Sequence, residues 1–358
     1  MSDELLLVGS IPLRNVEQVF RTFGAPLGPY LPAMPDGEVG ERRWWVIRIA
    51  YQVFNGHPEL ETLRRPKPDD GVERLVPRDR SDSWQFKVKD GVDAVRFGHP
   101  GLRLGFASDA INSYFIFRKL KEEGVIPKSV RFQIALPLIN SVVTIGTFPV
   151  AGDLEKVRPG YEAALAAEIA RIVEELPQDD IALQWDCSWE ITDMYNGIKG
   201  LDPSDAIDRN IGQIARLSRL VPERVQLGFH FCFGTFGGWP RFAPDSLSGA
   251  VDLANAAVVQ AGRKIDWVHI PTLDTVADSF YAPLRALKPD GARIYLGLIH
   301  SMNTFRERLA AARRHLPDFG LAAYCGFGRE PVSALPQILE DHLSAVRIAR
   351  ETQAQAVA

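Results

Sequence analysis

The feature that most constrains the fold is a regular alternation of short apolar runs with longer helical patterns across residues 107–350. The apolar runs have the length of buried strands, and each is followed by a segment long enough for a helix. This order builds right-handed βαβ units and a parallel sheet. Strands are expected at residues 130–136, 181–186, 224–232, 265–270, 293–298 and 320–324, and helices at residues 107–123, 153–176, 203–219, 246–261, 279–287, 302–315 and 332–350.

Two further apolar runs, at residues 5–10 and 30–34, lie near the N-terminus and bring the expected strands to eight. A helix is expected between them at residues 15–23 and another at residues 44–54. Eight βα units over about 250 residues are what a (β/α)8 barrel, or TIM barrel, requires. We therefore expect one α/β barrel domain over residues 1–358. A doubly wound open sheet is the alternative, but no Gly-x-Gly-x-x-Gly motif follows the first strand.

Residues 57–105 interrupt this order after the second strand. They are rich in proline and charge, and they are expected to form an insertion that packs on the barrel. Residues 84–88 and 94–97 alternate between apolar and polar side chains. This alternation predicts that the two segments pair as a β-hairpin.

Polar side chains gather at or just after the C-terminal ends of the expected strands. In a barrel these ends meet on one face, where active sites are built. All three cysteines of the chain are in this set, which core packing does not readily explain. The set comprises Ser10, Asp36, Asp186, Cys187, His230, Cys232, His300 and Cys325.

His230, Cys232 and Cys325 form a candidate metal site. Residues i and i+2 of a strand share one face, so His230 and Cys232 project the same way, and Cys325 follows another short apolar run. One imidazole and two thiolates suit Zn²⁺, and three protein ligands with an open fourth position are typical of catalytic zinc. Bound there, zinc would lower the pKa of a substrate thiol and present it as a nucleophile. The alternative is a neutral histidine with two free thiols.

Other residues at this face could take part in catalysis. Asp186 is a candidate for orienting the substrate or for acid–base catalysis, and His300 is a candidate base that could instead cap the helix after it. Glu38 either faces the barrel mouth or pairs with Arg42 one helical turn later. The candidates for contact with substrate are Ser10, Cys187 and Arg329, of which Arg329 would bind an anion.

Charge and composition exclude several partners. The formal net charge is -4 and there is no basic run, so nucleic acid and anionic membrane surfaces are not expected partners. No apolar run approaches the length of a membrane span. Three cysteines do not make a disulfide framework, and the first four residues are acidic where a signal peptide is basic. We expect a cytoplasmic protein that acts on small molecules, and oligomerisation stays open.

The sequence resembles the C-terminal catalytic barrel of cobalamin-independent methionine synthase, within the superfamily that includes uroporphyrinogen decarboxylase. The similar motifs occur in the family's order over nearly the whole chain except residues 57–105. They are Val8-Gly9-Ser10-Ile11-Pro12 (family I-G-S-F-P), Gly37-Glu38-Val39-Gly40-Glu41-Arg42 (H-G-E-x-E-R), Gln184-Trp185-Asp186 (Q-x-D-E), His230-Phe231-Cys232 (H-x-C), His300-Ser301 (D-I-H-S) and Cys325-Gly326-Phe327-Gly328-Arg329 (D-C-G-L-K-T-R). The resemblance implies a TIM barrel, zinc on His230, Cys232 and Cys325, and methyl transfer to a thiol.

Three departures from the family argue against homocysteine as the substrate. Pro271 stands where the family has a glutamate that completes the zinc site, and His269 is expected to point to the other face of its strand. Cys187 replaces the glutamate after Q-x-D, and Leu298 or Ile299 replaces the aspartate before the I-H-S motif. An amino-acid ammonium would lose the two carboxylate partners at Cys187 and at Leu298 or Ile299, and a buried unpaired charge is costly. We therefore expect zinc-dependent methyl or alkyl transfer to a more apolar or aromatic thiol. The alternatives are a lyase or decarboxylase using Asp186, His300 and Arg329, and a non-catalytic binding barrel.

Overall fold

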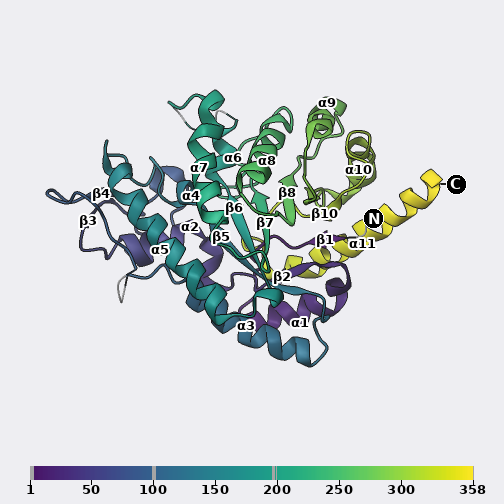
Figure 1. Ribbon diagram of the computed structural model, residues 1–358, viewed down its shortest axis with the longest axis horizontal. Helices are drawn as coiled ribbons and strands as arrows, with labels where there is room; N and C mark the ends of the chain where they lie inside the picture. The colour runs from purple at the N-terminus through teal and green to yellow at the C-terminus, as the bar shows by residue number, and fades with distance from the viewer. Residues whose placement is uncertain (1–3, 99–101, 196–197, 199, 358) are drawn as a thin grey trace.

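The computed structural model describes residues 4–98, 102–195, 198 and 200–357. In these ranges eight parallel strands form a nearly closed barrel with helices around it, which confirms the (β/α)8 fold (Figure 1). Around the barrel the order is β1, β10, β9, β8, β7, β6, β5 and β2. The strands are β1 (Leu5–Leu6), β2 (Ala33–Pro35), β5 (Arg131–Pro137), β6 (Ile181–Cys187), β7 (Gln226–Phe231), β8 (Trp267–Pro271), β9 (Arg293–Gly297) and β10 (Gly320–Ala322).

The helices largely follow the expected order along the chain. They are α1 (Val16–Leu27), α2 (Val46–Ile49), α3 (Phe106–Glu122), α4 (Ile139–Val142), α5 (Asp153–Glu175), α6 (Trp189–Asp193), α7 (Ala206–Ser218), α8 (Ser248–Gln260), α9 (Asp278–Tyr281), α10 (Phe305–Arg313) and α11 (Leu335–Val357). Short 3₁₀ or π segments lie at Gly28–Tyr30, Gly40–Trp44, Ala50–Phe54, Arg80–Asp82, Gln178–Asp180, Pro203–Asp205, Ala282–Ala286, Met302–Thr304 and Val332–Ala334.

The helix expected at residues 279–287 is shorter than predicted. It is divided into α9 and the 3₁₀ segment Ala282–Ala286, in which Pro283 lies in the first turn and lacks a backbone N–H donor. None of the described helices has the combination of length and apolar character that crossing a membrane requires.

β1 and β2 lie at the two ends of the strand order. Hydrogen bonds made by residues next to these strands connect them. The N–H of Ile11 donates to the carbonyl of Gly37 at 2.7 Å. The side chain of Gln133, on β5, donates through Nε2 to the carbonyl of Leu7 at 3.0 Å. These bonds hold the N-terminal segment against the β2 side and thereby position the loops that follow both strands.

Two large aromatic side chains fill the interior of the barrel. Trp267 on β8 and Tyr295 on β9 are almost fully buried in a small cluster separate from the main core. Each requires a glycine on the neighbouring strand. A Cβ on Gly228 would lie 2.0 Å from the Trp267 ring, and one on Gly320 would lie 2.4 Å from the Tyr295 ring. The barrel interior at this level is therefore a packed core.

The main core lies between the barrel and the surrounding helices. Phe20 of α1, Phe117 of α3 and Phe132 of β5 pack edge to face or tilted, with ring centroids 5.4–6.3 Å apart. The sequence alternation accounts for this packing, because the outward-facing side chains of each parallel strand meet the apolar side of a helix.

Residues 57–105 form a small sheet beside α5, but the predicted strand pairing was wrong. β4 (Gln85–Val88) pairs antiparallel with β3 (Leu60–Arg64), not with residues 94–97. The latter segment lies against α5 instead, where the N–H of Val95 donates to the carbonyl of Lys156 at 3.0 Å. Gly160 permits this approach, because a Cβ there would lie 1.9 Å from the Val95 carbonyl oxygen. The alternation at 94–97 therefore marks packing against a helix.

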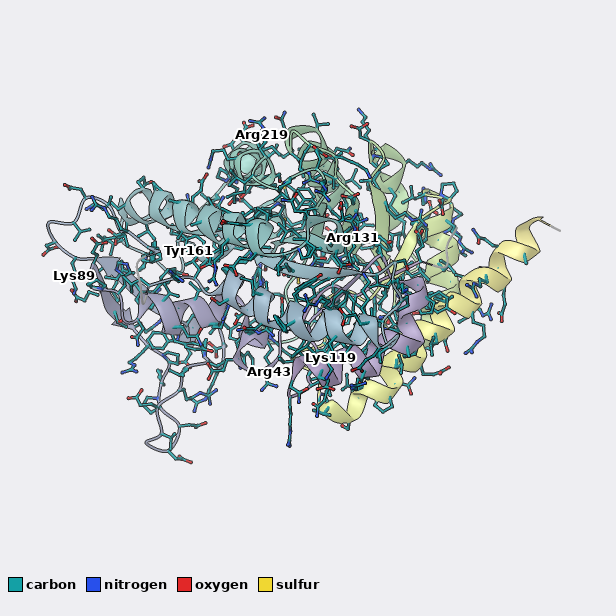
Figure 2. All side chains as sticks on the ribbon, turned by 60° about the horizontal axis from the view of Figure 1, so that its bottom comes forward. Arg43, Lys89, Lys119, Arg131, Tyr161 and Arg219 are labelled. Carbon is teal, nitrogen blue, oxygen red and sulfur yellow. The ribbon has the colours of Figure 1, made fainter. Side chains whose placement is uncertain are left out.

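The inserted hairpin shares aromatic packing with the barrel helices. Phe86 of β4 lies 5.7 Å from Phe54 and 6.0 Å from Phe148, measured between ring centroids. Tyr161 of α5 is fully buried in the same region, whereas Lys89, which follows β4, lies at the edge of the molecule (Figure 2). This packing fixes the hairpin next to the loops at the C-terminal ends of the strands.

Candidate functional site

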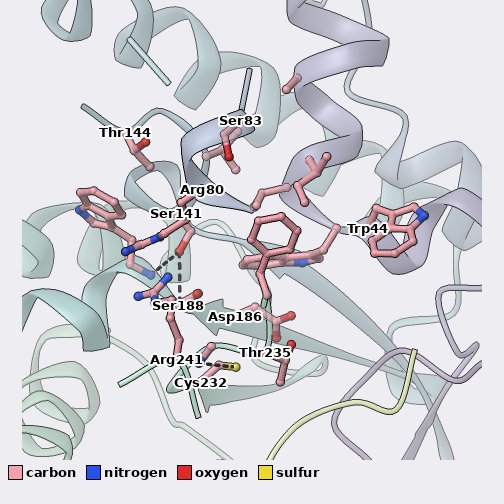
Figure 3. Close-up of a pocket in the computed structure, with 18 of the residues that line it drawn as sticks. Trp44, Arg80, Ser83, Ser141, Thr144, Asp186, Ser188, Cys232, Thr235 and Arg241 are labelled. Atoms are coloured by element: carbon pink, nitrogen blue, oxygen red, sulfur yellow. Dashed lines mark hydrogen bonds between the residues drawn. The ribbon is translucent and has the colours of Figure 1, made fainter. Parts of the chain in front are cut away.

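A cavity of about 530 Å³ opens where the C-terminal ends of the barrel strands meet (Figure 3). Most of the polar residues expected at this face line it. They come from the loops after β1, β2 and β10 and from β6 and β7, and are Ser10, Glu38, Asp186, His230, Cys232 and Cys325. The walls also include Trp44 and Trp45 before α2, residues Arg80, Ser83 and Trp84 of the insertion, Trp189 of α6 and Arg241 after β7.

The three predicted metal ligands converge at the base of this cavity. The Cys232 Sγ lies 3.3 Å from the Cys325 Sγ, which in turn lies 3.8 Å from His230 Nε2. One donor atom from each residue lies within 4.8 Å of the others, and no further His, Cys, Asp or Glu in the described residues joins the group. Tetrahedral ligands with Zn–S bonds of about 2.3 Å are about 3.8 Å apart. The donor set therefore fits a zinc ion whose fourth ligand comes from the cavity.

His269 orients the imidazole of His230. Its Nε2 lies 2.9 Å from the carbonyl of Ala323, and its Nδ1 lies 2.7 Å from Nδ1 of His230. A carbonyl only accepts, so His269 Nε2 carries a hydrogen and its Nδ1 accepts from the N–H at His230 Nδ1. Burial, and then the neighbouring His230, lower the pKa of His269 and keep it neutral. These two hydrogen bonds leave His230 Nε2 with a free lone pair facing the thiols, as a metal ligand requires.

This arrangement corrects the expectation that His269 points away from the site. His269 and His230 are in register on adjacent parallel strands, so their side chains project to the same side of the sheet. His269 also lies two positions before Pro271 and shares its face. Counting by two along β8 from Pro271 would have placed His269 at the site from the sequence alone.

The pKa values of the two thiols at the site are shifted in opposite directions. The hydrogen bond with Cys325 lowers the pKa of Cys232 well below its ordinary value. The N–H of Gly234 also donates to the Cys232 Sγ at 3.3 Å. The same contact with Cys232, followed by burial, raises the pKa of Cys325. A bound cation would favour loss of the proton from both thiols.

Asp186 and Glu38 form a pair of carboxyl groups on the cavity wall. Burial, followed by the charge of Glu38, raises the pKa of Asp186 well above its ordinary value. Burial, followed by Asp36, raises the pKa of Glu38 to about 7. Asp186 also accepts a hydrogen bond of 2.8 Å from Nε2 of Gln184, which lies two residues before it on β6. Carboxyl groups with raised pKa values can exchange protons near neutral pH.

Glu38 lines the cavity, and Arg42 forms its ion pair with Asp36 instead. Arg42 Nη1 lies 2.6 Å from Oδ2 of Asp36, and the N–H of Glu38 donates to Oδ1 of the same aspartate at 2.8 Å. Glu38 has a left-handed backbone with φ 46°, and it follows Gly37 with φ 80°. Glu38 therefore faces the barrel mouth, as one of the two alternatives predicted, and does not form an ion pair with Arg42.

Ser10 and Arg329 both line the cavity. The N–H of Gly328 donates to Oγ of Ser10 at 3.2 Å, so the loop after β10 packs on the loop after β1. Gly326 allows this approach, because a Cβ there would lie 2.6 Å from the Ser10 nitrogen. Arg329 is exposed at the rim and donates from Nη1 to the hydroxyl of Thr235.

Two of the predicted site residues lie away from the cavity. Cys187 is fully buried on the outer face of β6, where its Sγ lies 3.7 Å from the carbonyl of Trp185. Strand alternation explains this, because Asp186 faces inward and its neighbour must face the helices. His300 has Nε2 3.0 Å from the carbonyl of Thr272, and its pKa is lowered to about 4 by burial and then by Arg308. Neither residue lines the cavity, although Cys187 was expected to contact the substrate and His300 to act as a base.

The residues of the cavity walls that lie outside the strand ends were not predicted from the sequence. Arg80 and Trp84 belong to the insertion, and Arg241 lies in the loop after β7. A prediction based on strand ends cannot place such residues. Arg80 and Trp84 themselves, in a segment rich in proline and charge, were the available signal.

Comparisons with known proteins show the fold. A B12-independent methionine synthase from Shewanella sp. W3-18-1, in complex with selenomethionine, is similar with a TM-score of 0.61 and 12% sequence identity, covering 99% of each chain. A putative vitamin-B12-independent methionine synthase from Listeria monocytogenes is similar with a TM-score of 0.53 and 17% identity, covering 94% of this chain and 86% of the other. No protein-family model and no curated protein matches the sequence. The chain therefore has the fold of the methionine synthase catalytic barrel.

Proposed function

We propose that this protein is a zinc-dependent enzyme that transfers a methyl or alkyl group to the sulfur of a small thiol. The observation that carries the proposal is the convergence of His230 Nε2, Cys232 Sγ and Cys325 Sγ at the base of the cavity. Zinc held by these three residues would lower the pKa of a substrate thiol bound beside them. The fold shared with methionine synthases supports this class of reaction.

The chain's own residues hold the substrate and move a proton. Glu38, with its pKa raised to about 7, accepts the proton that the thiol releases. Asp186 orients the substrate from the other side, and its carboxyl is held by Gln184. Trp44 and Trp45 cover the cavity and reduce the access of water to the nucleophile.

The substrate proposed here is more apolar than homocysteine. The family's two carboxylates that would pair with an amino-acid ammonium are replaced by Cys187, which faces the helices, and by Leu298 or Ile299, which are buried and do not line the cavity. The tryptophan-rich walls suit an aromatic or apolar thiol. The lyase alternative loses its proposed base, because His300 lies outside the cavity and has a pKa of about 4.

The direct test is the zinc content of protein purified without added metal. We expect close to one equivalent of zinc in the wild-type protein and its loss in His230→Ala and in the double variant Cys232→Ser/Cys325→Ser. The matched control is Cys187→Ala, which removes the third thiol outside the cavity and should keep the metal. A second readout is the alkylation of small aromatic thiols by candidate methyl donors.

Two results would contradict the proposal. One is wild-type protein that contains no zinc and does not take it up after dialysis against it. The other is zinc content that stays the same in His230→Ala and in the double cysteine variant. Far-ultraviolet circular dichroism of each variant separates loss of metal from loss of fold.

A further inference from the structure

Four arginines line the cavity, and none of them forms an ion pair with a carboxylate in the described residues. They are Arg43, Arg80, Arg241 and Arg329. Most other arginines in the described part of the chain do have such a partner, for example Arg42 with Asp36 and Arg209 with Asp193. Guanidinium groups left without an acid inside a cavity favour an anionic ligand, because a poorly solvated unpaired charge is costly.

The guanidinium group of Arg241 is held in place by neutral contacts. Its Nη2 donates to the hydroxyl of Thr192, which itself donates to the carbonyl of Ser188 at 2.7 Å. Its stem packs on Gly234, where a Cβ would lie 2.9 Å from the Arg241 Cβ. Burial, followed by the charge of Arg80, lowers the pKa of Arg241 to about 10. Arg241 is therefore a cation held by neutral hydrogen-bond partners, with no carboxylate paired to it among the described residues.

Arg80 brings a second cation to the same wall from the insertion. It opens the 3₁₀ segment Arg80–Asp82, where the side chain of Asp79 accepts from the N–H groups of Ser81 and Asp82. The Arg80 side chain has no hydrogen-bond partner among the described residues, and it lies on the same side of the cavity as Arg241 (Figure 3). Two planar guanidinium groups from separate loops can together bind one planar anion.

The charge balance of the cavity is opposite to that of the whole chain. The lining carries four arginines against two acids, Glu38 and Asp186, and both acids have raised pKa values. The chain itself has a formal net charge of -4. The Nε of Arg43 is also buried without a hydrogen-bond partner, and its guanidinium lies 5.2 Å from the Trp44 ring centroid. A local positive potential on an acidic protein attracts small anions.

We propose that Arg80 and Arg241 bind the anionic group of an organic acid whose apolar or aromatic body lies against Trp44, Trp84 and Trp189. This inference rests on the proposed function in one respect, because it takes the substrate of the proposed reaction to bind in this cavity. A carboxylate matches the two planar guanidinium groups best, and phosphate and sulfonate share the required charge. The insertion at residues 57–105 is thus part of the substrate site of this chain.

The test is isothermal titration of the metal-replete full chain with benzoate, phenyl phosphate, benzenesulfonate and neutral benzamide. We expect at least one of the anions to bind at millimolar concentration or tighter, and benzamide to bind at least about tenfold more weakly. Arg80→Gln and Arg241→Gln should each weaken the anion by about tenfold or more. The anion that binds most tightly shows whether the natural ligand carries a carboxylate, a phosphate or a sulfonate group.

Arg78→Gln is the matched control, because Arg78 lies on the same inserted loop but pairs with Asp69 and does not line the cavity. It should leave anion binding unchanged. The inference is overturned if benzamide binds as well as the anions, if none of the three anions binds at millimolar concentration, or if Arg80→Gln and Arg241→Gln bind like the control. Zinc content in the two arginine variants should equal that of the wild type. Anion binding that survives in metal-free His230→Ala keeps this inference separate from the proposed zinc chemistry.

Discussion

Replacing His269 by phenylalanine tests how the structure prepares His230 for a metal. The substitution keeps a ring of similar size but removes both nitrogens that join His230 Nδ1 to the carbonyl of Ala323. Two buried polar groups lose their partners, and each unsatisfied group costs about 1–3 kcal/mol. The His230 ring also loses the contact that fixes its hydrogen on Nδ1, so protonation of Nε2 competes with metal binding.

The expected loss of zinc affinity is about 10–100-fold, the range found for groups that orient metal-binding histidines. This corresponds to about 1.4–2.8 kcal/mol, which agrees with one unsatisfied buried group in the metal-bound state. The assay is competition for zinc against a chromophoric chelator of known affinity at neutral pH. Thermal unfolding in excess chelator measures the cost of the substitution to the metal-free fold separately.

His315→Phe is the control for replacing a buried histidine elsewhere. His315 lies after α10, with Nε2 2.9 Å from Asp278, and it has no contact with the cavity. The His315→Phe substitution should alter the stability of the fold without altering zinc affinity. The reasoning fails if His269→Phe binds zinc as tightly as the wild type while His230→Ala does not bind it.

Two further predictions concern the barrel interior and the cavity carboxyl groups. Gly228→Ala places a Cβ 2.0 Å from the Trp267 ring, and we expect a loss of about 1–3 kcal/mol in the free energy of unfolding. Gly56→Ala, with open space around it, should change far less in the same denaturant titration. Because the pKa of Glu38 is raised from 4.5 to about 7, the folded state binds more protons between these values, and stability should fall as pH rises through this window. Glu38→Gln should remove up to about 3 kcal/mol of that fall, and equal pH profiles for variant and wild type would contradict the assignment.

The barrel was predictable because its signal is repeated along the chain. The strand and helix lengths alternate from residue 107 onward, and the polar residues collect at the C-terminal strand ends. The convergence of Cys325 with Cys232 follows from that topology, because both lie at the same end of one closed sheet. Cys187 and His300 were misplaced for local reasons, namely strand alternation at Cys187 and contacts with Thr272 and Arg308 at His300.

The insertion and the cavity walls were harder to predict, because they depend on tertiary contacts. The alternation at residues 94–97 is the pattern of a strand, but the segment packs on α5 at the space left by Gly160. Arg80 and Arg241 are ordinary surface residues by sequence, and only the fold brings them to one cavity. His269 could have been placed by strand register, whereas its hydrogen bond to Ala323 needed coordinates.

The most direct test of the account is an anomalous-scattering map at the zinc edge, from crystals of protein purified without chelator. We predict a single strong peak about 2.0–2.1 Å from His230 Nε2 and about 2.3 Å from the sulfurs of Cys232 and Cys325. Its fourth neighbour should be solvent or ligand in the cavity. An absent peak between these three side chains, with their donor atoms still converged and the crystals soaked in zinc, would contradict the central claim.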